Sequence, residues 1–348
     1  MSAVVRGGMF AEAPEFPPIS IPDRREDDMR AIVITENGGP EVLAAGERPD
    51  PRPGPGEVLI DVAAAGVNFI DVYFRTGAYR QDLPYTPGVE AAGTVAAVGE
   101  GVAEFSVGDR VAWANVQGAY AERAALPACR VVPVPDGLAL EDAAASLLQG
   151  MTTHYLTRST YPIQEGDTVL VHAAAGGMGL LLTQAAKALG ARVLGTASTP
   201  EKEKLAKDAG ADVTMGYDGF PEKVRELTGG EGVAAVYDGV GAPTFDGSLA
   251  SLRRRGTLAL YGAAGGPVPP LDPQRLNAAG SVYLTRPSLN HFTEVREELL
   301  ERAAAAYGWV ESGAVRIHVG HRYDLAEART AHADLEARRS TGKLLLIP

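Results

Sequence analysis

The sequence predicts an α/β protein in which a β-rich domain precedes a domain built on a doubly wound, six-stranded parallel sheet. Short strand-like segments with frequent glycine and proline fill residues 30–135, whereas strand-like and helical segments alternate from about residue 140. Repeated strand–helix–strand units favour a parallel sheet that helices cover on both faces. A chain of 348 residues is long enough to bury two such cores.

Four strand-like segments bounded by turn residues define the β-rich part. They are EVLIDVAAAGV (57–67), EAAGTVAAVGEGV (90–102), VGDRVAWA (107–114) and AYAERAALP (119–127). The helical segment 292–313 and the closing KLLLIP return to mixed character, so we expect the last stretch to pack on the first domain. The predicted division is one domain from 29–149 with 287–348, and a second domain from 150–286.

The second domain is predicted from six strand-like segments. They are TVLVHA (168–173), ARVLGTAS (191–198), ADVTMG (211–216), AAVYDGV (234–240), TLALYG (257–262) and SVYLTRP (281–287). Helical segments lie between them, among them 180–190, 199–210, 221–230 and 243–256.

Composition and charge exclude several classes of partner. The formal net charge of −12 argues against a nucleic-acid backbone or an anionic membrane as the main partner. A single cysteine, Cys129, rules out an intramolecular disulfide and a cysteine-rich zinc site, and we expect it to be a small buried residue. The presence of one cysteine also fits a cytoplasmic protein. The proline-rich residues 1–28 lack the apolar core of a secretory signal and are expected to form a poorly ordered extension.

The segment HAAAGGMG (172–179) stands between an apolar strand and a helix, where dinucleotide-binding proteins carry the pattern G-x-G-x-x-G. Alanine replaces the first glycine of that pattern. A turn of this kind lets a pyrophosphate approach the backbone at the positive end of a helix. We therefore predict a Rossmann cofactor site at Ala174, Gly176, Gly177, Met178 and Gly179, the alternative being a turn that serves packing alone.

The next strand indicates which nicotinamide cofactor binds. Sites for NAD end this strand with an acidic residue that binds the ribose 2′-hydroxyl. Here the strand ends in Ala197 and Ser198, and Lys202 follows in the first turn of the next helix. A lysine there opposes the helix dipole unless it meets an anion, so the pattern favours NADPH; otherwise Lys202 is one charge of a solvated run.

Several motifs together resemble a known family. The segments GVNFIDVYFRTGAY (66–79), PYTPGVEAAGTVAAVGEGV (84–102), GDRVAW (108–113), VHAAAGGMG (171–179), YLTRPSL (283–289) and GKLLLIP (342–348) are similar to the zinc-free quinone oxidoreductases of the medium-chain dehydrogenase/reductase superfamily. The resemblance covers residues 30–348. It implies a GroES-like catalytic domain, a Rossmann domain that binds NADPH, a small-molecule quinone as substrate, and a homodimer.

A catalytic metal is not expected. Where the alcohol dehydrogenases of this superfamily carry a cysteine and a histidine ligand, this chain carries Asn68 and Val89. Without zinc to stabilise an alkoxide, quinones and conjugated enones are better electron acceptors than simple ketones.

The resemblance also implies roles for individual residues. Those expected beside the reacting groups are Asn68, Asp71 and Tyr73. Those expected to line the substrate pocket are Ile70, Tyr79 and Thr152. Beyond the glycine turn, those expected to bind the cofactor are Phe69, Tyr155, Ser198, Lys202, Tyr217, Tyr261, Gly262, Ala263, Ala264, Tyr283, Thr285, Arg286 and Arg338.

Alternatives remain at the level of residues and of function. Asn68 and Asp71 are also the residue types that cap the start of a helix, and the tyrosines could be core residues. The same motifs occur in enone and enoyl-thioester reductases. A non-catalytic protein that binds NADPH or RNA is a third reading, which the intact cofactor turn and the negative charge disfavour.

Overall fold

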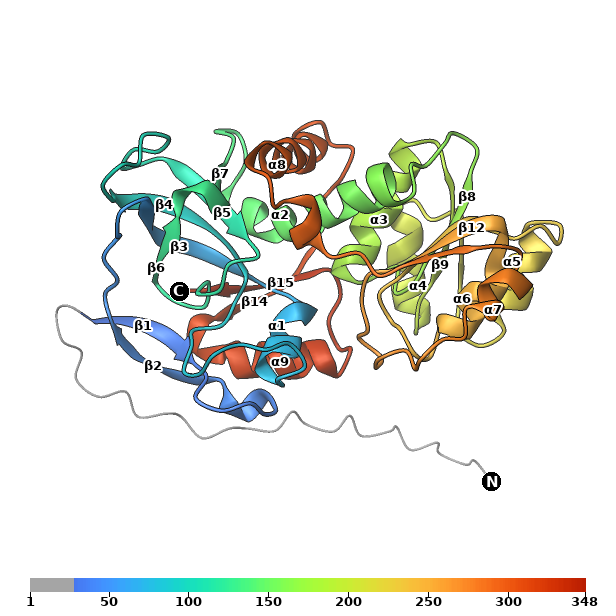
Figure 1. The fold of residues 1–348 in the computed structure, drawn as a ribbon, viewed down its shortest axis with the longest axis horizontal. Helices are drawn as coiled ribbons and strands as arrows, with labels where there is room; N and C mark the ends of the chain where they lie inside the picture. The colour runs from blue at the N-terminus through green and yellow to red at the C-terminus, as the bar shows by residue number, and fades with distance from the viewer. Residues whose placement is uncertain (1–27) are drawn as a thin grey trace, which may run out of the picture.

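The computed structural model describes residues 28–348, so the predicted extension lies, apart from Asp28, outside the described residues. Two lobes face each other, and helix α2 (Leu140–Tyr155) runs from one to the other (Figure 1). In residues 28–348, no helix has the length and apolar character that crossing a bilayer requires.

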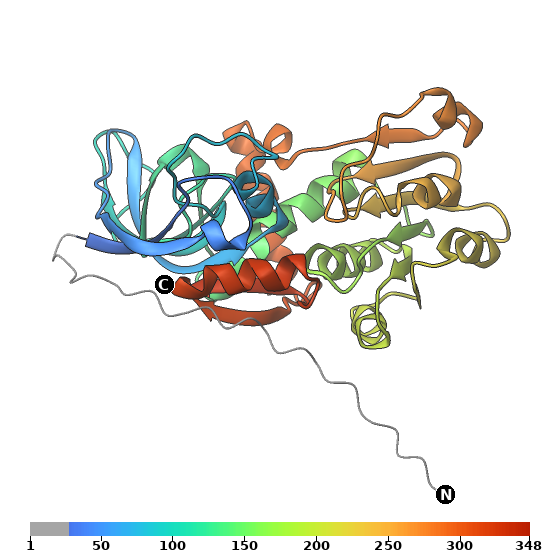
Figure 2. The same ribbon diagram turned by 90° about the horizontal axis from the view of Figure 1, so that it is seen from below.

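The α/β lobe contains a six-stranded sheet in the order β10-β9-β8-β11-β12-β13, with every pair of neighbours parallel. The strands are β8 (Thr168–Val171), β9 (Arg192–Thr196), β10 (Val213–Met215), β11 (Val233–Asp238), β12 (Leu252–Leu260) and β13 (Tyr283–Thr285). The helices are α3 (Gly177–Ala188), α4 (Pro200–Asp208), α5 (Phe220–Leu227), α6 (Phe245–Ser251) and α7 (Gln274–Ala278). Seen along the sheet, helices lie on both of its faces, as the sequence predicts (Figure 2).

One predicted helix in this lobe is too long. The segment 243–256 was expected to be helical throughout, but α6 ends at Ser251 and β12 begins at the next residue. Leu252 has an extended backbone and pairs with Val233 of β11, so pairing in the sheet overrides the local helical pattern.

The β-rich lobe contains a seven-stranded sheet in the order β14-β15-β3-β4-β5-β7, with β6 paired to β3, and a separate antiparallel pair, β1–β2. The strands are β1 (Asp28–Val33), β2 (Ala44–Pro49), β3 (Glu57–Val67), β4 (Glu90–Val98), β5 (Arg110–Ala114), β6 (Arg123–Pro127), β7 (Val131–Pro133), β14 (Val319–Asp324) and β15 (Lys343–Ile347). The helices are α1 (Phe69–Arg75), α8 (Arg296–Glu311) and α9 (Ala328–Glu336), with short turns η1 (Pro40–Val42), η2 (Ala128–Arg130), η3 (Leu156–Thr160), η4 (Leu289–Phe292) and η5 (Leu325–Glu327). Cys129 lies exposed in η2, so the expectation that it is buried is wrong: the turn directs it to solvent.

The end of the chain is part of the first lobe's sheet. Strand β15 pairs antiparallel with β3, and α8 packs against α2 (Figure 1). The predicted boundary at 149/150 falls inside α2, which contacts strands of the β-rich sheet and α3 of the other lobe. The division at 149/150 and 286/287 stays a prediction.

A buried ion pair joins β15 to the elements around it. The Lys343 ammonium lies 2.5 Å from Glu90 Oε2, and both side chains are almost fully buried. The same ammonium donates to Asn68 Oδ1 at 2.7 Å, and the Leu148 N–H donates to Glu90 Oε1 at 2.6 Å. A side chain at Gly66 would place its Cβ 2.4 Å from Glu90 Oε2, so glycine in β3 makes room for the pair. Four elements, β15, β4, α2 and the start of α1, therefore meet at one pair of charges.

We expect Lys343→Met to destabilise the protein by about 3–5 kcal/mol, because it leaves the Glu90 charge buried without its counter-ion. The double variant Lys343→Met/Glu90→Gln should recover part of that loss. The measurement is urea unfolding followed by circular dichroism. The control is Lys204→Met, which removes an exposed pair with Asp208 and should cost under about 1 kcal/mol. Equal losses for Lys343→Met and the control would contradict the prediction.

Candidate active site

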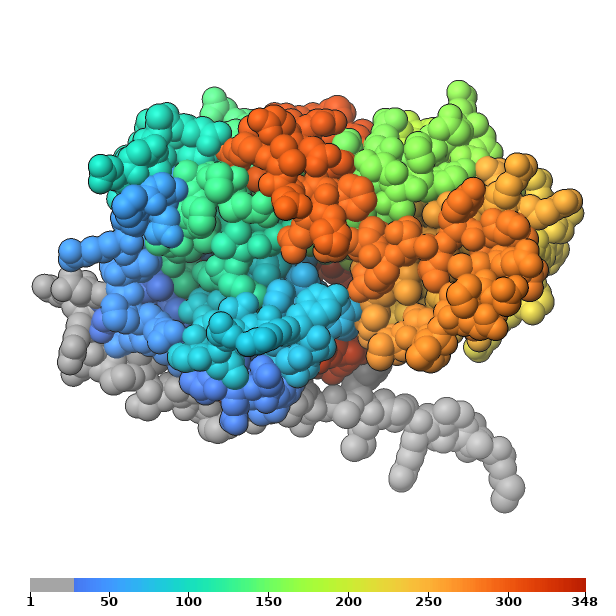
Figure 3. Space-filling model, in the orientation of Figure 1, coloured from blue at the N-terminus to red at the C-terminus, as the bar shows by residue number. Residues whose placement is uncertain are grey.

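A cavity of about 350 Å³ lies between the two lobes. Residues of α1 and α2, of the glycine turn, and of the segment 335–344 line it. Figure 3 shows the hollow between the cyan segment near residue 80 and the orange segment of the α/β lobe, with the dark red end of the chain visible inside it.

The glycine turn forms one wall of the cavity. The Ala174 N–H donates to the Thr196 carbonyl at 2.9 Å, which fixes the turn on β9. A Cβ at Gly179 would lie 2.2 Å from the Ala173 oxygen, so only glycine permits this approach of helix α3 to the turn. Gly195 in β9 makes room for the Ala174 methyl group, because a Cβ there would lie 2.9 Å from it. The alanine at the first motif position therefore fits without opening the turn.

One end of the cavity is cationic. Lys202 of α4, Tyr217 and Arg338 all line it. The Lys202 ammonium donates to the Arg338 carbonyl at 2.7 Å, and burial together with the Arg338 charge lowers the Lys202 pKa. Within residues 28–348, neither Lys202 nor Arg338 forms an ion pair with a carboxylate. Two cations with no anion between them fit a phosphate group.

The other end of the cavity is aromatic. The ring of Tyr73 lies 5.9 Å from that of Phe69 and 5.2 Å from that of Tyr79, measured between centroids. The Tyr73 hydroxyl accepts a hydrogen bond from the Ala263 N–H at 2.9 Å, so it bridges the two lobes. Burial raises the Tyr73 pKa, which keeps the phenol protonated and leaves its O–H able to donate. The Arg286 guanidinium lies 3.5 Å from the Tyr79 hydroxyl.

Asn68 and Asp71 both support the start of α1. The Asn68 amide donates to Glu90 Oε2 at 2.9 Å and accepts from Lys343, so both ends of its side chain are engaged. Asp71 is buried and accepts from the Asn68 N–H at 2.9 Å, a bond that caps the helix. Burial raises the Asp71 pKa to about 7, against the lowering effect of the Asn68 N–H, the Tyr120 hydroxyl and Lys343.

No group of three or more histidine, cysteine or acidic side chains suited to a metal lies together in the part of the chain that the structure describes. The Asn68 side chain, which stands where the alcohol dehydrogenases carry a cysteine ligand, is hydrogen-bonded to Glu90 and Lys343. The position of Val89 is a buried aliphatic side chain.

Comparisons with known proteins agree with this geometry. Residues 54–136 match the family model of the alcohol dehydrogenase GroES-like domain, and residues 177–305 match that of the zinc-binding dehydrogenases. A quinone oxidoreductase from Pseudomonas aeruginosa is 45% identical, covering 92% of this chain and 99% of its own. A 2-haloacrylate reductase from Burkholderia is 40% identical over 91% of this chain and 98% of its own.

Among solved structures, a mycobacterial protein complexed with NADPH is 58% identical, with a TM-score of 0.90 over 92% of this chain and 100% of that one. The chain belongs to the quinone oxidoreductase family of the medium-chain dehydrogenase/reductase superfamily. The resemblance drawn from the motifs is confirmed, as is the combination of a GroES-like lobe with a Rossmann lobe.

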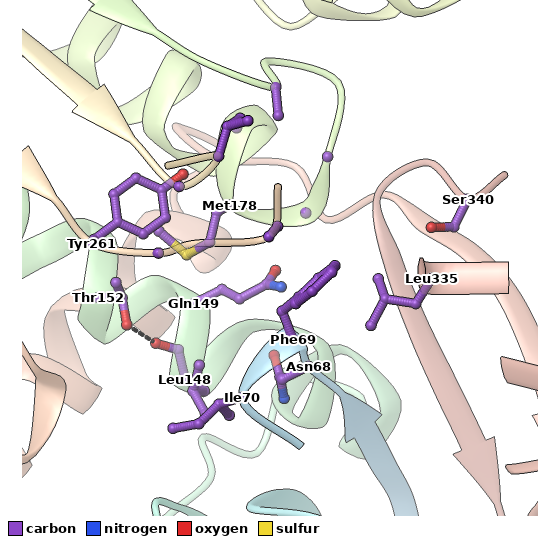
Figure 4. Close-up of a pocket in the computed structure, with 18 of the residues that line it drawn as sticks. Asn68, Phe69, Ile70, Leu148, Gln149, Thr152, Met178, Tyr261, Leu335 and Ser340 are labelled. Carbon is purple, nitrogen blue, oxygen red and sulfur yellow. Dashed lines mark hydrogen bonds between the residues drawn. The ribbon is translucent and has the colours of Figure 1, made fainter. Parts of the chain in front are cut away.

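The structure brings most of the expected site residues to one cavity. Those that line it are Asn68, Phe69, Ile70, Tyr73, Tyr79, Thr152, Tyr155, Gly176, Gly177, Met178, Gly179, Ser198, Lys202, Tyr217, Tyr261, Gly262, Ala264, Arg286 and Arg338. Figure 4 shows Met178, Tyr261 and Thr152 on one side of the space and Asn68, Phe69 and Ile70 on another.

Five expected residues do not line the cavity. Asp71 is on α1 with its side chain buried, and Ala174 is buried within the glycine turn. Ala263 reaches the site through its backbone N–H, which meets Tyr73. Tyr283 and Thr285 lie on the edge strand β13, and Tyr283 is 62% exposed. Alternation along that short strand turns the Tyr283 ring away from the cleft.

Sequence reasoning missed several residues of the cavity wall, among them Leu148, Gln149, Leu335 and Ser340 (Figure 4). Gln149 lies in α2 against the glycine turn: a Cβ at Gly177 would lie 2.6 Å from its Oε1. That oxygen is buried and has no hydrogen-bond partner among the described residues. An amide between apolar residues of a helix, in LLQGM, is the signal that could have identified it.

Proposed function

We propose that this protein reduces quinones with NADPH and without a metal. The observation that carries the proposal is a single cavity with a cationic end at Lys202 and Arg338, an aromatic end at Tyr73, and a glycine turn between them. The mycobacterial relative complexed with NADPH supports the choice of cofactor. Relatives named quinone oxidoreductases support the choice of acceptor.

The chain offers NADPH a set of contacts matched to its parts. The open backbone at Gly176 and Gly177 and the start of α3 bind the pyrophosphate. Lys202 and Arg338 bind the 2′-phosphate, with the Tyr217 hydroxyl beside them. When bound, NADPH supplies a hydride from C4 of its nicotinamide ring. The remaining task of the protein is to hold that ring and an acceptor face to face in a space without bulk water.

The aromatic end performs that task for the acceptor. Phe69, Ile70 and Thr152 give the quinone a flat and largely apolar wall. The Tyr73 hydroxyl, which accepts from Ala263, can still donate its own proton in a hydrogen bond to the quinone oxygen. Asn68 acts through Tyr73's helix, because its amide is bound to Glu90 and Lys343. A reduced quinone is a stabilised anion that takes its proton from solvent, so no strong general acid is required.

A second acceptor class is favoured by Arg286. Its guanidinium lines the cavity near Tyr79 and forms no ion pair with a carboxylate of residues 28–348. A cation at the acceptor end suits a conjugated acid or thioester, and one relative is named a 2-haloacrylate reductase. Reduction of enones or enoyl thioesters is our alternative activity.

We also propose a cytoplasmic homodimer. Strand β13 is the last strand of the six-stranded sheet, and Tyr283 on it is exposed. An uncovered edge of this kind invites pairing with a second copy about a twofold axis.

Replacing Lys202 tests whether the protein prefers NADPH to NADH. NADPH should bind at least about tenfold more tightly than NADH, a difference of about 1.4 kcal/mol. Lys202→Ala should weaken NADPH and leave NADH nearly unchanged, because only NADPH carries the 2′-phosphate. The measurement is fluorescence titration. The control is Lys204→Ala, which changes a lysine two positions along α4 that does not line the cavity. Equal affinities for the two cofactors would refute the assignment.

The acceptor class is tested by NADPH oxidation against quinones, enones and enoyl thioesters. With a good quinone, Tyr73→Phe should lower kcat/KM by about threefold to tenfold, the cost of one neutral hydrogen bond. With an enoyl thioester, which needs protonation at carbon, the loss should be about a hundredfold or more. A thousandfold loss with quinones would show that the mechanism is misassigned. Turnover of the enones and enoyl thioesters alone would favour the alternative activity.

The proposed association of two chains is tested at the exposed edge strand β13. The protein should sediment at twice the mass of one chain, and Tyr283→Asp should shift the equilibrium toward single chains, because it places charges against each other in the paired strands. Glu201→Lys, an exposed change on α4, serves as the control. A dimer unaffected by Tyr283→Asp would place the interface elsewhere.

A further inference from the structure

A series of hydrogen-bonded, buried polar side chains joins α1 to α9, and the proposed reaction does not use it. It runs from Asp71 through Tyr120 and His332 to Arg75, and each of these residues is at most 1% exposed. We propose that this relay, as we call these four residues, is a positioning device that couples the two ends of the cleft, so that disturbing it beside α1 weakens the hold on the 2′-phosphate. The proposal rests on the proposed function.

The relay is continuous at hydrogen-bond distances. The Tyr120 hydroxyl donates to Asp71 Oδ2 at 2.9 Å and lies 3.1 Å from His332 Nε2. The other ring nitrogen, His332 Nδ1, lies 3.3 Å from Arg75 NH1. Arg75 closes the chain by donating through NH2 to Glu336 at 2.7 Å. Helices α1 and α9, far apart in the sequence, are thus joined through their polar groups.

Donor and acceptor directions fix one protonation pattern. Arg75 can only donate, so His332 Nδ1 must accept and its Nε2 must carry the proton. Nε2–H then donates to the Tyr120 oxygen, which leaves the Tyr120 proton for Asp71. Burial, together with the Arg75 charge, lowers the His332 pKa to about 3, so the ring stays neutral and keeps this tautomer. The hydrogen bonds of the relay therefore all run in one direction, from the Arg75 guanidinium to Asp71 Oδ2.

Charged groups on the neighbouring elements hold both ends of the relay. On the Asp71 side, Lys343 of β15 favours the carboxylate and Glu90 of β4 opposes it. On the Arg75 side, Glu336 of α9 supplies the counter-charge. The Arg75 Nε also donates to the Gly38 carbonyl at 3.2 Å.

The relay reaches the cofactor end of the cleft through the end of α9. Leu335, one turn after His332 on this helix, lines the cavity, and its carbonyl accepts from the Arg338 N–H at 3.1 Å. The Arg338 carbonyl in turn accepts from Lys202 across the cleft. In the view of Figure 4, Leu335 and Ser340 lie to the right of Phe69, on the side away from Met178 and Thr152. The helix that anchors the relay therefore also sets the position of the 2′-phosphate cations.

The test uses a probe that cannot reach α1. Adenosine 2′,5′-bisphosphate carries the 2′-phosphate and a 5′-phosphate but no nicotinamide, so its affinity reports the cationic end and the adjoining glycine turn. Tyr120→Phe keeps the ring and removes the hydroxyl that joins Asp71 to His332. We expect it to weaken binding of the probe by about threefold to tenfold in calorimetry, and to lower the NADPH-over-NADH ratio of kcat/KM by a similar factor.

The matched control is Tyr323→Phe. The Tyr323 hydroxyl donates to Asp334 at 2.6 Å, so this change also removes a tyrosine–carboxylate bond to α9, but it removes no hydrogen bond of the relay. It should leave probe affinity within twofold. Thermal unfolding of both variants separates a loss of stability from a loss of coupling.

A second relay variant, Arg75→Lys, tests the proposal independently in case Tyr120→Phe does not fold. Arg75→Lys keeps the positive charge. The single ammonium of lysine cannot reach both His332 and Glu336, which the two terminal nitrogens of the arginine guanidinium contact. It should reproduce the loss of probe affinity. If the unaltered protein does not bind the probe, the assignment of NADPH fails. If it binds the probe and both relay variants bind it equally well, NADPH stands and the coupling is refuted.

Discussion

The contact between the Lys343 ammonium and the Glu90 carboxylate is the interaction on which the rest of the β-rich lobe depends. Two opposite charges removed from water are costly unless hydrogen bonds satisfy what the pair leaves open, and here the Asn68 amide and the Leu148 N–H do so. The last strand of the chain is thereby tied to β4, to the start of α1 and to α2. Residues of the segment 338–344 line the cavity and lead into β15, which pairs with β3, so the ion pair also holds this part of the cavity wall.

This arrangement holds the turn that leads from β3 into α1. Asn68 is held through its side chain by the ion pair and through its N–H by Asp71. The start of α1 therefore has little freedom, and the rings of Phe69 and Tyr73 project from a fixed base into the cavity. A site that works by placing two flat rings together needs such a base more than it needs a strong acid.

The sequence was sufficient to predict the parts that local patterns encode. Alternating strand and helix signals predicted the parallel sheet, and the turn at 172–179 with Lys202 predicted a cationic cofactor site whose residues the structure gathers in one cavity. It could not predict the partners of Glu90, because Lys343 lies 253 positions away and nothing local marks either residue as buried. The same holds for Tyr120 and His332, which are 212 positions apart. Short strands were also ambiguous: the pattern of β13 did not reveal that Tyr283 faces solvent at a sheet edge.

We expected Asn68 and Asp71 either to lie beside the reacting groups or to cap a helix. The structure shows the helix cap, and the capped helix α1 carries residues that line the cavity. Asp71 does not line the cavity, and the Asn68 amide is bound to Glu90 and Lys343, so neither is placed to exchange a proton with an acceptor. Their effect on chemistry passes through the position of α1. In an enzyme that uses zinc, the corresponding place in the sequence supplies a ligand that contacts the metal; here an amide bound to an internal ion pair occupies it. The transition state is then stabilised by geometry and by the electron affinity of the acceptor, which is why the proposed substrates are quinones and conjugated enones.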